Sequence, residues 1–319
     1  MWCGSPILGE DGRYHLFASR WSKAVSFFNW ATHSEIVRAV SDTPAGPYRF
    51  EEVVLPVRGE EFWDGRVTHN PAIRKHGDQY LLFYTGTTFR GPRHESSPDR
   101  FKLTDQWVEA WNHKRCGMLV ADSVYGPWKR ADAPILETRS GEWDAVITSN
   151  PAPCVHEDGR LTLIYKSTHV RHTTGPFAGR FHLGCAKAPH WSEPLQRAGD
   201  GLIRIKGSDD HHLEDGFVWW NGEGYELIAK DMTGEICGEA QAAIHAFSPD
   251  AVNWEVAPQS KAYSRTVTWD DGEQTTLSKL ERPQILFEQG KPAMLFAATL
   301  FKSDDGDVID SYNLAIPLK

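Results

Sequence analysis

The stretch His69-Asn70-Pro71, followed by AIRKHGDQYLLFYTG (residues 72–86), indicates the architecture of this chain because variants of it recur along the sequence. It combines a short polar motif, an apolar strand, a tight turn that contains glycine, and a second apolar strand. Four more copies begin at Gly4-Ser5-Pro6, Ser149-Asn150-Pro151, Glu214-Asp215-Gly216 and Glu281-Arg282-Pro283. With the last residue of each motif as its anchor (6, 71, 151, 216 and 283), neighbouring copies are 65 to 80 residues apart. A glycine in each turn, such as Gly77, supplies the positive φ that a hairpin turn requires.

Repeats of this length, each with about four strands, are typical of β-propeller blades. We therefore predict an all-β fold, a five-bladed β-propeller that forms a single domain over residues 1–319. Only 36 residues follow Pro283, which leaves room for about three strands in the last blade. The best candidate for a helix is the segment from Thr104 to Lys114. Because the chain opens directly on an inner strand, we also expect that a native N-terminal segment is missing.

The composition argues against several classes of protein. The formal net charge is −9, whereas nucleic-acid-binding domains usually present a basic face, so we expect no nucleic-acid partner. No run of 18 apolar residues is present, so we expect no membrane span. The 13 Trp residues can pack blades together, and Trp faces also stack on sugar rings.

The cysteines and short motifs bear on location and cofactors. Five scattered cysteines without a C-x-x-C pair favour reduced thiols and a cytoplasmic location, or a periplasmic or secreted one if an N-terminal segment is missing. The sequence contains no P-loop and no G-x-G-x-x-G motif, and we expect no cofactor. A divalent cation such as calcium in the channel is the alternative. His69 is more often a hydrogen-bonding residue than a metal ligand, so no metal site is assigned, and the oligomeric state is left open.

Blades 2 and 3 share the longer motif W-D-x-x-x-T-x-N-P, which spans residues 63–71 and 143–151. Asp64 and Asp144 are candidates for a catalytic base or for acceptors of sugar hydroxyls. In the alternative interpretation each Asp caps the turn before its strand, as Asp often does, while the preceding Trp packs between blades. Asn70 and Asn150, inside the motif, are natural ligands for hydroxyl groups.

Blade 4 opens with two adjacent acids, Glu214 and Asp215, before the apolar run FVWW. A carboxyl group in such a setting has a raised pKa, which suits a general acid for a glycosidic oxygen. Glu281 takes the position of Glu214 in blade 5, as a second catalytic carboxylate or a hydroxyl ligand, and Arg282 could hold an acidic sugar. Structural ion pairs with nearby basic residues are the alternative for both blades.

The remaining candidates would bind the sugar. Trp2, Trp63 and Trp143 are candidate stacking faces, while Arg66, His69, Asn70, Asn150, His212, Asp215 and Arg282 are candidate polar ligands.

Through these repeats, the whole chain resembles the five-bladed propeller glycosidases of glycoside hydrolase family 43 and its relatives in families 32, 62, 68 and 117. The resemblance implies a glycoside hydrolase that removes a terminal sugar from an oligo- or polysaccharide, with an inverting outcome by analogy. It implies that Glu214 is the general acid. The family places an Asp base on the first inner strand, but that strand reads Trp2-Cys3-Gly4-Ser5-Pro6. The base would then come from Asp64 or Asp144 or from the missing N-terminal segment, or the chemistry differs.

Two other functions remain open. The first is a propeller glycoside phosphorylase, in which Arg66, Arg282 and His69 form a phosphate site. The second is a carbohydrate-binding propeller without catalysis, which the missing Asp on the first inner strand favours.

Overall fold

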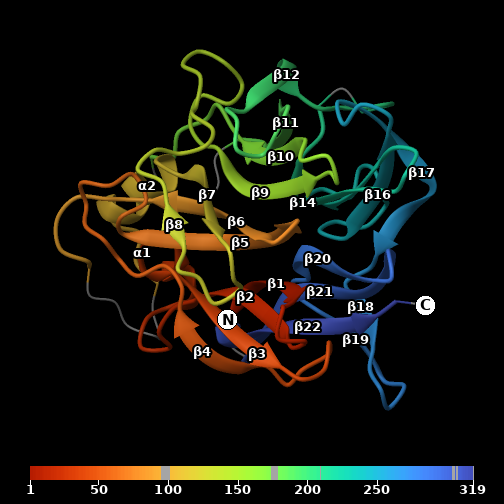
Figure 1. The fold of residues 1–319 in the computed structure, drawn as a ribbon, viewed down its shortest axis with the longest axis horizontal. Coiled ribbons are helices and arrows are strands. Elements are labelled where there is room, and N and C mark those ends of the chain that lie inside the picture. The colour runs from red at the N-terminus through yellow and green to blue at the C-terminus, as the bar shows by residue number, and fades with distance from the viewer. Residues whose placement is uncertain (95–100, 174–178, 209, 304–305, 307, 319) are drawn as a thin grey trace.

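The computed structural model describes the chain except for residues 95–100, 174–178, 209, 304–305, 307 and 319. It contains five antiparallel sheets arranged around a central axis (Figure 1), which confirms the predicted all-β, five-bladed propeller. No helix in the described part of the chain is long and apolar enough to cross a membrane.

The strands follow the sequence repeats. Blade 1 contains β1 (Trp2–Leu8), β2 (Tyr14–Arg20), β3 (Glu35–Ser41) and β4 (Arg49–Val53). Blade 2 contains β5 (Val67–His76), β6 (Gln79–Thr87), β7 (Arg115–Ala121) and β8 (Lys129–Arg130). Blade 3 contains β9 (Ser149–Val155), β10 (Leu161–Ser167), β11 (His182–Ala188) and β12 (Gln196–Leu202). Blade 4 contains β14 (Leu213–Trp220), β15 (Tyr225–Asp231), β16 (Ala243–Ser248) and β17 (Asn253–Tyr263), with β13 (Arg204–Ile205) parallel to β17. Blade 5 contains β20 (Glu281–Glu288), β21 (Lys291–Lys302) and β22 (Val308–Pro317), the three strands that the remaining length predicted.

A small hairpin and three short helical segments complete the described fold. The hairpin consists of β18 (Thr266–Thr268) and β19 (Gln274–Thr276). A 3₁₀ turn (Phe27–Asn29) leads into α1 (Trp30–His33), and α2 (Asp105–Asn112) lies within the predicted helical segment. The Thr104 side chain caps α2 by accepting a hydrogen bond from the backbone N–H of Trp107, which satisfies one of the free amides of the first turn.

Each inner strand begins with a β-bulge. The pairing of β1 with β2 shifts between Trp2 and Ser5, and that of β5 with β6 shifts between His69 and Ala72. Gly4 is therefore equivalent to Pro71, so the first repeat begins two residues earlier than the anchor at Pro6 predicted. One bulge residue per blade has a positive φ: Cys3, Asn70, Asn150, Asp215 and Arg282, between 52° and 59°. Because a bulge sets two residues against one, consecutive side chains can reach the axis.

The core consists of apolar clusters between neighbouring blades. Leu82 of blade 2 packs in one cluster with Phe17 of blade 1, and Ile164 of blade 3 packs in another with Leu227 of blade 4. The ring closes where Leu16 of blade 1 meets Phe296 and its neighbours in blade 5. Since each blade buries its faces against two others, the polar starts of the inner strands are held at one end of the channel.

Candidate active site

A cavity of about 130 Å³ lies where the inner strands begin. It has room for about ten water molecules. Eight of the predicted site residues line it: Trp2, His69, Asn70, Asn150, Glu214, Asp215, Glu281 and Arg282. Every blade contributes at least one of them, so the structure confirms that the polar motifs converge.

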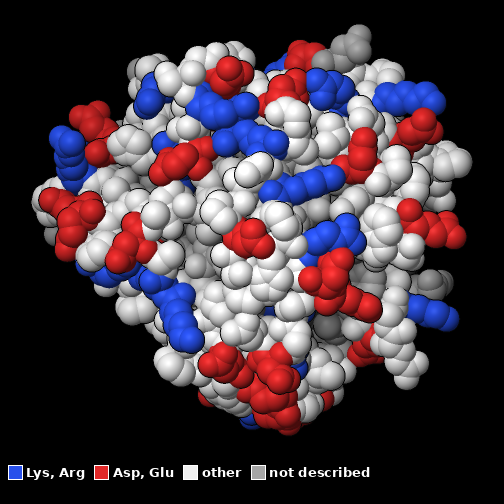
Figure 2. Space-filling model, turned by 45° about the horizontal axis from the view of Figure 1, so that its top comes forward, with Lys and Arg blue, Asp and Glu red and all other residues white. Residues whose placement is uncertain are grey.

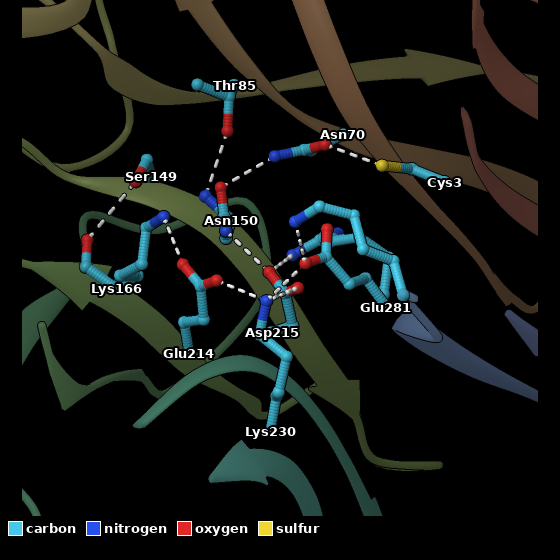
Figure 3. A network of polar contacts seen from close by, with 12 residues as sticks. Cys3, Asn70, Thr85, Ser149, Asn150, Lys166, Glu214, Asp215, Lys230 and Glu281 are labelled. Carbon is cyan, nitrogen blue, oxygen red and sulfur yellow. Dashed lines mark hydrogen bonds and ion pairs between the residues drawn. The ribbon is translucent and has the colours of Figure 1, made fainter. Parts of the chain in front are cut away.

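The acidic side of the cavity is a chain of ion pairs, which we call the ion-pair network (Figure 3). Lys166 Nζ lies 2.9 Å from one carboxylate oxygen of Glu214, and Lys230 Nζ contacts the other. Lys230 Nζ also lies 2.8 Å from Glu281, whose same oxygen is 2.7 Å from Lys279 Nζ. The Lys230 side chain is only 1% exposed, so its charge depends on these carboxylates.

The network sets the protonation of both glutamates. Burial alone raises the pKa of Glu214, but Lys166 and Lys230 outweigh it and hold the pKa well below its usual range. The prediction of a raised pKa is therefore wrong, because lysines on the second strands of blades 3 and 4 face this carboxyl group. Burial also raises the pKa of Glu281, but Lys230 and Lys279 lower it below the ordinary value. Both groups are carboxylates in the free protein.

A second set of side chains, which we call the axial ring, consists of one bulge residue from each blade: Cys3, Asn70, Asn150, Asp215 and Arg282. Cys3 donates its thiol to Asn70 Oδ1 at 2.8 Å, and Asn70 Nδ2 donates to Asn150 Oδ1 at 2.6 Å. Asn150 Nδ2 donates to Asp215 Oδ1 at 2.8 Å, and Arg282 Nη1 lies 3.5 Å from the same oxygen. Burial raises the pKa of Cys3, although the nearby Arg282 guanidinium opposes the shift, so this residue is a thiol and not a nucleophilic thiolate.

Part of the cavity lining is an aromatic wall, which consists of Trp2, Phe27, Trp21, His69, Trp30 and Trp111. Consecutive rings are in contact, with centroids 5.1 to 6.0 Å apart, and the ring of His69 stacks on Trp30 at 5.1 Å. Burial, together with the charges of Lys114, Arg282 and Lys166, lowers the pKa of His69 well below its usual value. His69 is therefore neutral, and its Nδ1 forms a hydrogen bond with Ser34 Oγ at 2.7 Å.

No group of three or more His, Cys, Asp or Glu side chains suited to a metal ion occurs among the residues that the structure describes. Lysines contact both carboxylate oxygens of Glu214 and one oxygen of Glu281, which a cation would need as ligands. A calcium ion in the channel thus gains no support from this donor set, and the expectation of a protein without a cofactor stays a prediction.

The structure does not bring Asp64 and Asp144 to the cavity. Asp64 is fully buried and accepts hydrogen bonds from Arg58, Arg130 and Tyr84. Asp144 is also fully buried, and it accepts from Arg139, Arg197 and Tyr165 in the equivalent arrangement of blade 3. With both oxygens of each carboxylate occupied, these residues join the loop before a blade to its outer strands. Their geometry fits the structural alternative and not the role of a base.

Four of the predicted sugar contacts also lie outside the cavity lining: Trp63, Trp143, Arg66 and His212. Trp63 stacks on Tyr84 with centroids 5.8 Å apart, and Trp143 stacks on its own blade tyrosine in the same way. Arg66 Nη2 donates to Glu60 and to the carbonyl oxygen of Gly91. His212 packs near Phe181 instead. The predicted phosphate site of Arg66, His69 and Arg282 is therefore not assembled.

The predicted site residues did not include the lysines Lys114, Lys166, Lys230 and Lys279. One signal was available for two of them. Lys166 and Lys230 each follow three apolar residues on a second strand, directly opposite the inner-strand positions Ser149 and Glu214. A lysine at such a position is costly unless a carboxylate faces it, so the two charge patterns should be interpreted together.

Known proteins resemble this chain in structure. No protein-family model and no curated protein matches the chain. Among solved structures, a family 117 glycoside hydrolase from the marine bacterium Zobellia galactanivorans is 17% identical, with a TM-score of 0.61 over 99% of this chain and 84% of that one. A native arabinanase from Bacillus subtilis is 13% identical, with a TM-score of 0.57 over 100% and 94%.

A family 43 β-xylosidase/α-arabinofuranosidase from a compost microbial metagenome, solved with xylotriose, is 16% identical, with a TM-score of 0.57 over 96% and 93%. At these identities the likeness concerns the fold. The architectural resemblance that the repeats predicted is thus confirmed: the chain has the five-bladed propeller fold seen in structures of family 43 and family 117 glycoside hydrolases.

Proposed function

We propose that this chain is a glycoside hydrolase that removes a terminal sugar from an oligo- or polysaccharide bound in the cavity. The observation that carries the proposal is that two ionised carboxylates, Glu214 and Glu281, line one cavity together with a continuous aromatic wall. Aromatic faces stack on sugar rings, and a carboxylate stabilises the oxocarbenium-like transition state of glycoside cleavage. The fold supports the same class, since the similar compost protein was solved with a xylose oligosaccharide.

The separation of the carboxylates bears on the mechanism. One ammonium, that of Lys230, contacts both groups at 2.8 Å or less, so their nearest oxygens lie within 5.6 Å, twice that distance, of each other. Retaining enzymes hold their pair about 5–5.5 Å apart, whereas inverting enzymes leave about 6.5–9.5 Å for a water molecule. The two carboxylates are thus close enough for the retaining geometry, in which Glu214 would act as the nucleophile.

The charges also favour a division of roles. Glu214 is held as a carboxylate by two lysines and is the better nucleophile or stabiliser of positive charge. The pKa of Glu281 is lowered less strongly, and one of its partners, Lys279, has a side chain that is 31% exposed. A bound sugar that separates Lys279 from Glu281 would let Glu281 take up a proton and act as the acid.

Activity measurements on two variants test this proposal. Glu214→Gln should lose about 10²–10⁴-fold in turnover on every substrate, because the charge that faces the reacting carbon is gone. Glu281→Gln should lose as much on natural glycosides but retain activity on aryl glycosides with good leaving groups, which need little protonation. Glu226→Gln, on β15 and bonded to His245, is the matched control and should remain active. Full turnover by Glu214→Gln on a natural substrate would contradict the proposal.

A second candidate function is carbohydrate binding without turnover. It is favoured by a specific observation: both glutamates of the cavity are ionised, so the free protein offers no protonated Glu to a leaving group. Calorimetric binding of an oligosaccharide, with no product released over long incubation by the intact protein, would select this function.

A further inference from the structure

The cavity carries more positive than negative charge. Its cationic side chains are Lys114, Lys166, Lys230, Lys279 and Arg282, and its carboxylates are Glu214, Asp215 and Glu281. At formal charges this leaves an excess of two positive charges, in a chain whose net charge is −9. Figure 2 shows side chains of both charges on the outer surface, with acidic ones gathered along the lower edge of that face.

Lys114 is the source of much of this imbalance. Lys166, Lys230 and Lys279 each have a carboxylate within ion-pair distance. Within the described residues, Lys114 has none. It lies at the end of α2, where the chain enters β7, and it lines the cavity although the residue is only 4% exposed. Its ammonium is thus buried at the cavity, and the charge of Glu214 acts on it only from beyond ion-pair distance.

The surroundings of Lys114 are aromatic. Its Nζ lies 3.2 Å from the ring centroid of Trp111 and 4.3 Å from that of Trp30, so two indoles take the place of hydrogen-bond acceptors. Burial, and then the neighbouring charge of Lys166, lowers the pKa of Lys114 well below its usual range. A buried ammonium costs free energy unless it is paired, and such a position suits a group that receives its partner from a ligand.

We propose that the sugar bound in this cavity carries a carboxylate, as a uronic acid does, and that Lys114 is the residue that binds it. The inference rests on the proposed carbohydrate site and narrows its substrate class. The aromatic wall offers a face for the sugar ring beside the ammonium, and the ion-pair network lines the same cavity. The two positive charges in excess match one carboxylate better than a neutral sugar.

Calorimetry with matched ligands tests the charge preference. The probes are uronic-acid oligosaccharides and the same oligosaccharides after reduction of their carboxyl groups to alcohols. The charged form should bind the intact protein at least about tenfold more tightly, since a charge-assisted hydrogen bond is lost on reduction. Lys114→Met should lose this preference and still bind the reduced form as the unaltered protein does. Lys206→Met, an exposed lysine paired with Glu255, is the control and should keep the preference.

The outcomes distinguish the inferred carboxylate specificity from the proposed carbohydrate site. Equal binding of both forms by the intact protein, or a preference that survives in Lys114→Met, overturns the carboxylate inference and leaves the carbohydrate site intact. Binding of neither form overturns both. Inorganic phosphate provides a further arm: phosphate that binds through Lys114, while the oligosaccharides show no charge preference, also overturns the inference.

A second measurement needs no variant. Because burial lowers the pKa of Lys114, an arriving carboxylate should raise that pKa and favour the protonated form. Binding of the charged ligand should then take up protons at alkaline pH, and the heat of binding should depend on the ionisation enthalpy of the buffer. The carboxyl-reduced ligand should show no such dependence. Equal proton uptake for both ligands overturns the role of Lys114.

Discussion

Replacement of Lys230 by methionine tests the ion-pair network most directly. The Lys230 ammonium contacts Glu214, lies 2.8 Å from Glu281 and lies 3.5 Å from Asp215, and its side chain is 1% exposed. Lys230→Met keeps most of the volume and apolar stem of the side chain but removes the one charge that three carboxylates share. The variant therefore isolates the electrostatic contribution of this residue to stability.

The magnitude follows from burial. Removing one partner from a buried ion pair costs about 3–5 kcal/mol, because the remaining charges stay desolvated. Lys166 and Lys279 still neutralise part of the charge on Glu214 and Glu281, so we expect the lower half of this range. A domain is stabilised by about 5–15 kcal/mol, so the variant should fold and unfold roughly 5–10 °C earlier at pH 7.

The loss of stability in Lys230→Met should be smaller at low pH than at neutral pH. In the unaltered protein the pKa of Glu214 is lowered, so its contribution is present above the ordinary Glu value of about 4.3 and is lost as the pH falls through the folded pKa. Without Lys230 the folded pKa values of Glu214 and Glu281 rise. Protonation of these two glutamates then relieves the repulsion among the carboxylates at a higher pH in the variant than in the unaltered protein. The difference in stability should be largest at pH 7 and should narrow toward pH 4.5.

Thermal unfolding at several pH values provides the assay. Lys279→Met is the matched control, since it removes one ammonium from the same network but from a side chain that is 31% exposed. The free energy of unfolding of that variant should fall by only about 0–1 kcal/mol. Equal losses in the two variants, or a deficit of Lys230→Met that stays constant from pH 7 to pH 4.5, would refute the assignment of a shared buried charge.

Three further predictions concern the scaffold. Asp64→Asn should lower the free energy of unfolding by about 3 kcal/mol, because two arginines lose a buried partner, while turnover per folded molecule stays unchanged; chemical denaturation and activity assays check both. Gly117→Ala should also destabilise, since a Cβ there would lie 2.6 Å from Tyr84 and from Trp63, and a midpoint equal to that of the unaltered protein would contradict the packing. All five cysteines are free and buried, and burial raises the pKa of Cys116 to about 12, so a thiol reagent at pH 8 should react with none in the native protein and with five after unfolding.

The blade plan could be predicted from the sequence because each hairpin is encoded locally. The alternation of an apolar strand, a glycine turn and a second strand lies within about 20 residues, and its recurrence implies equivalent neighbours. The convergence of Glu214, Glu281 and Asn150 followed from the same repeat, since equivalent positions of a ring meet at one end. The anchor in blade 1 was placed two residues too late because Pro6 follows a polar residue, as the prolines of the other motifs do. The bulge at Cys3 instead makes Gly4 the equivalent residue.

The sequence alone therefore determined the number of blades, the strand content and the set of inner-strand side chains that share one end of the channel. Only the tertiary structure decided how those side chains are charged and which of them are free. The state of Glu214 depends on Lys166 and Lys230, which come from other strands, and Asp64 is taken out of the site by arginines 6 residues before it and 66 residues after it in the chain. The local sequence pattern shows which residues a strand contains. The pKa of a side chain and the identity of its counter-ion depend instead on distances between blades, and these distances exist only in the folded protein.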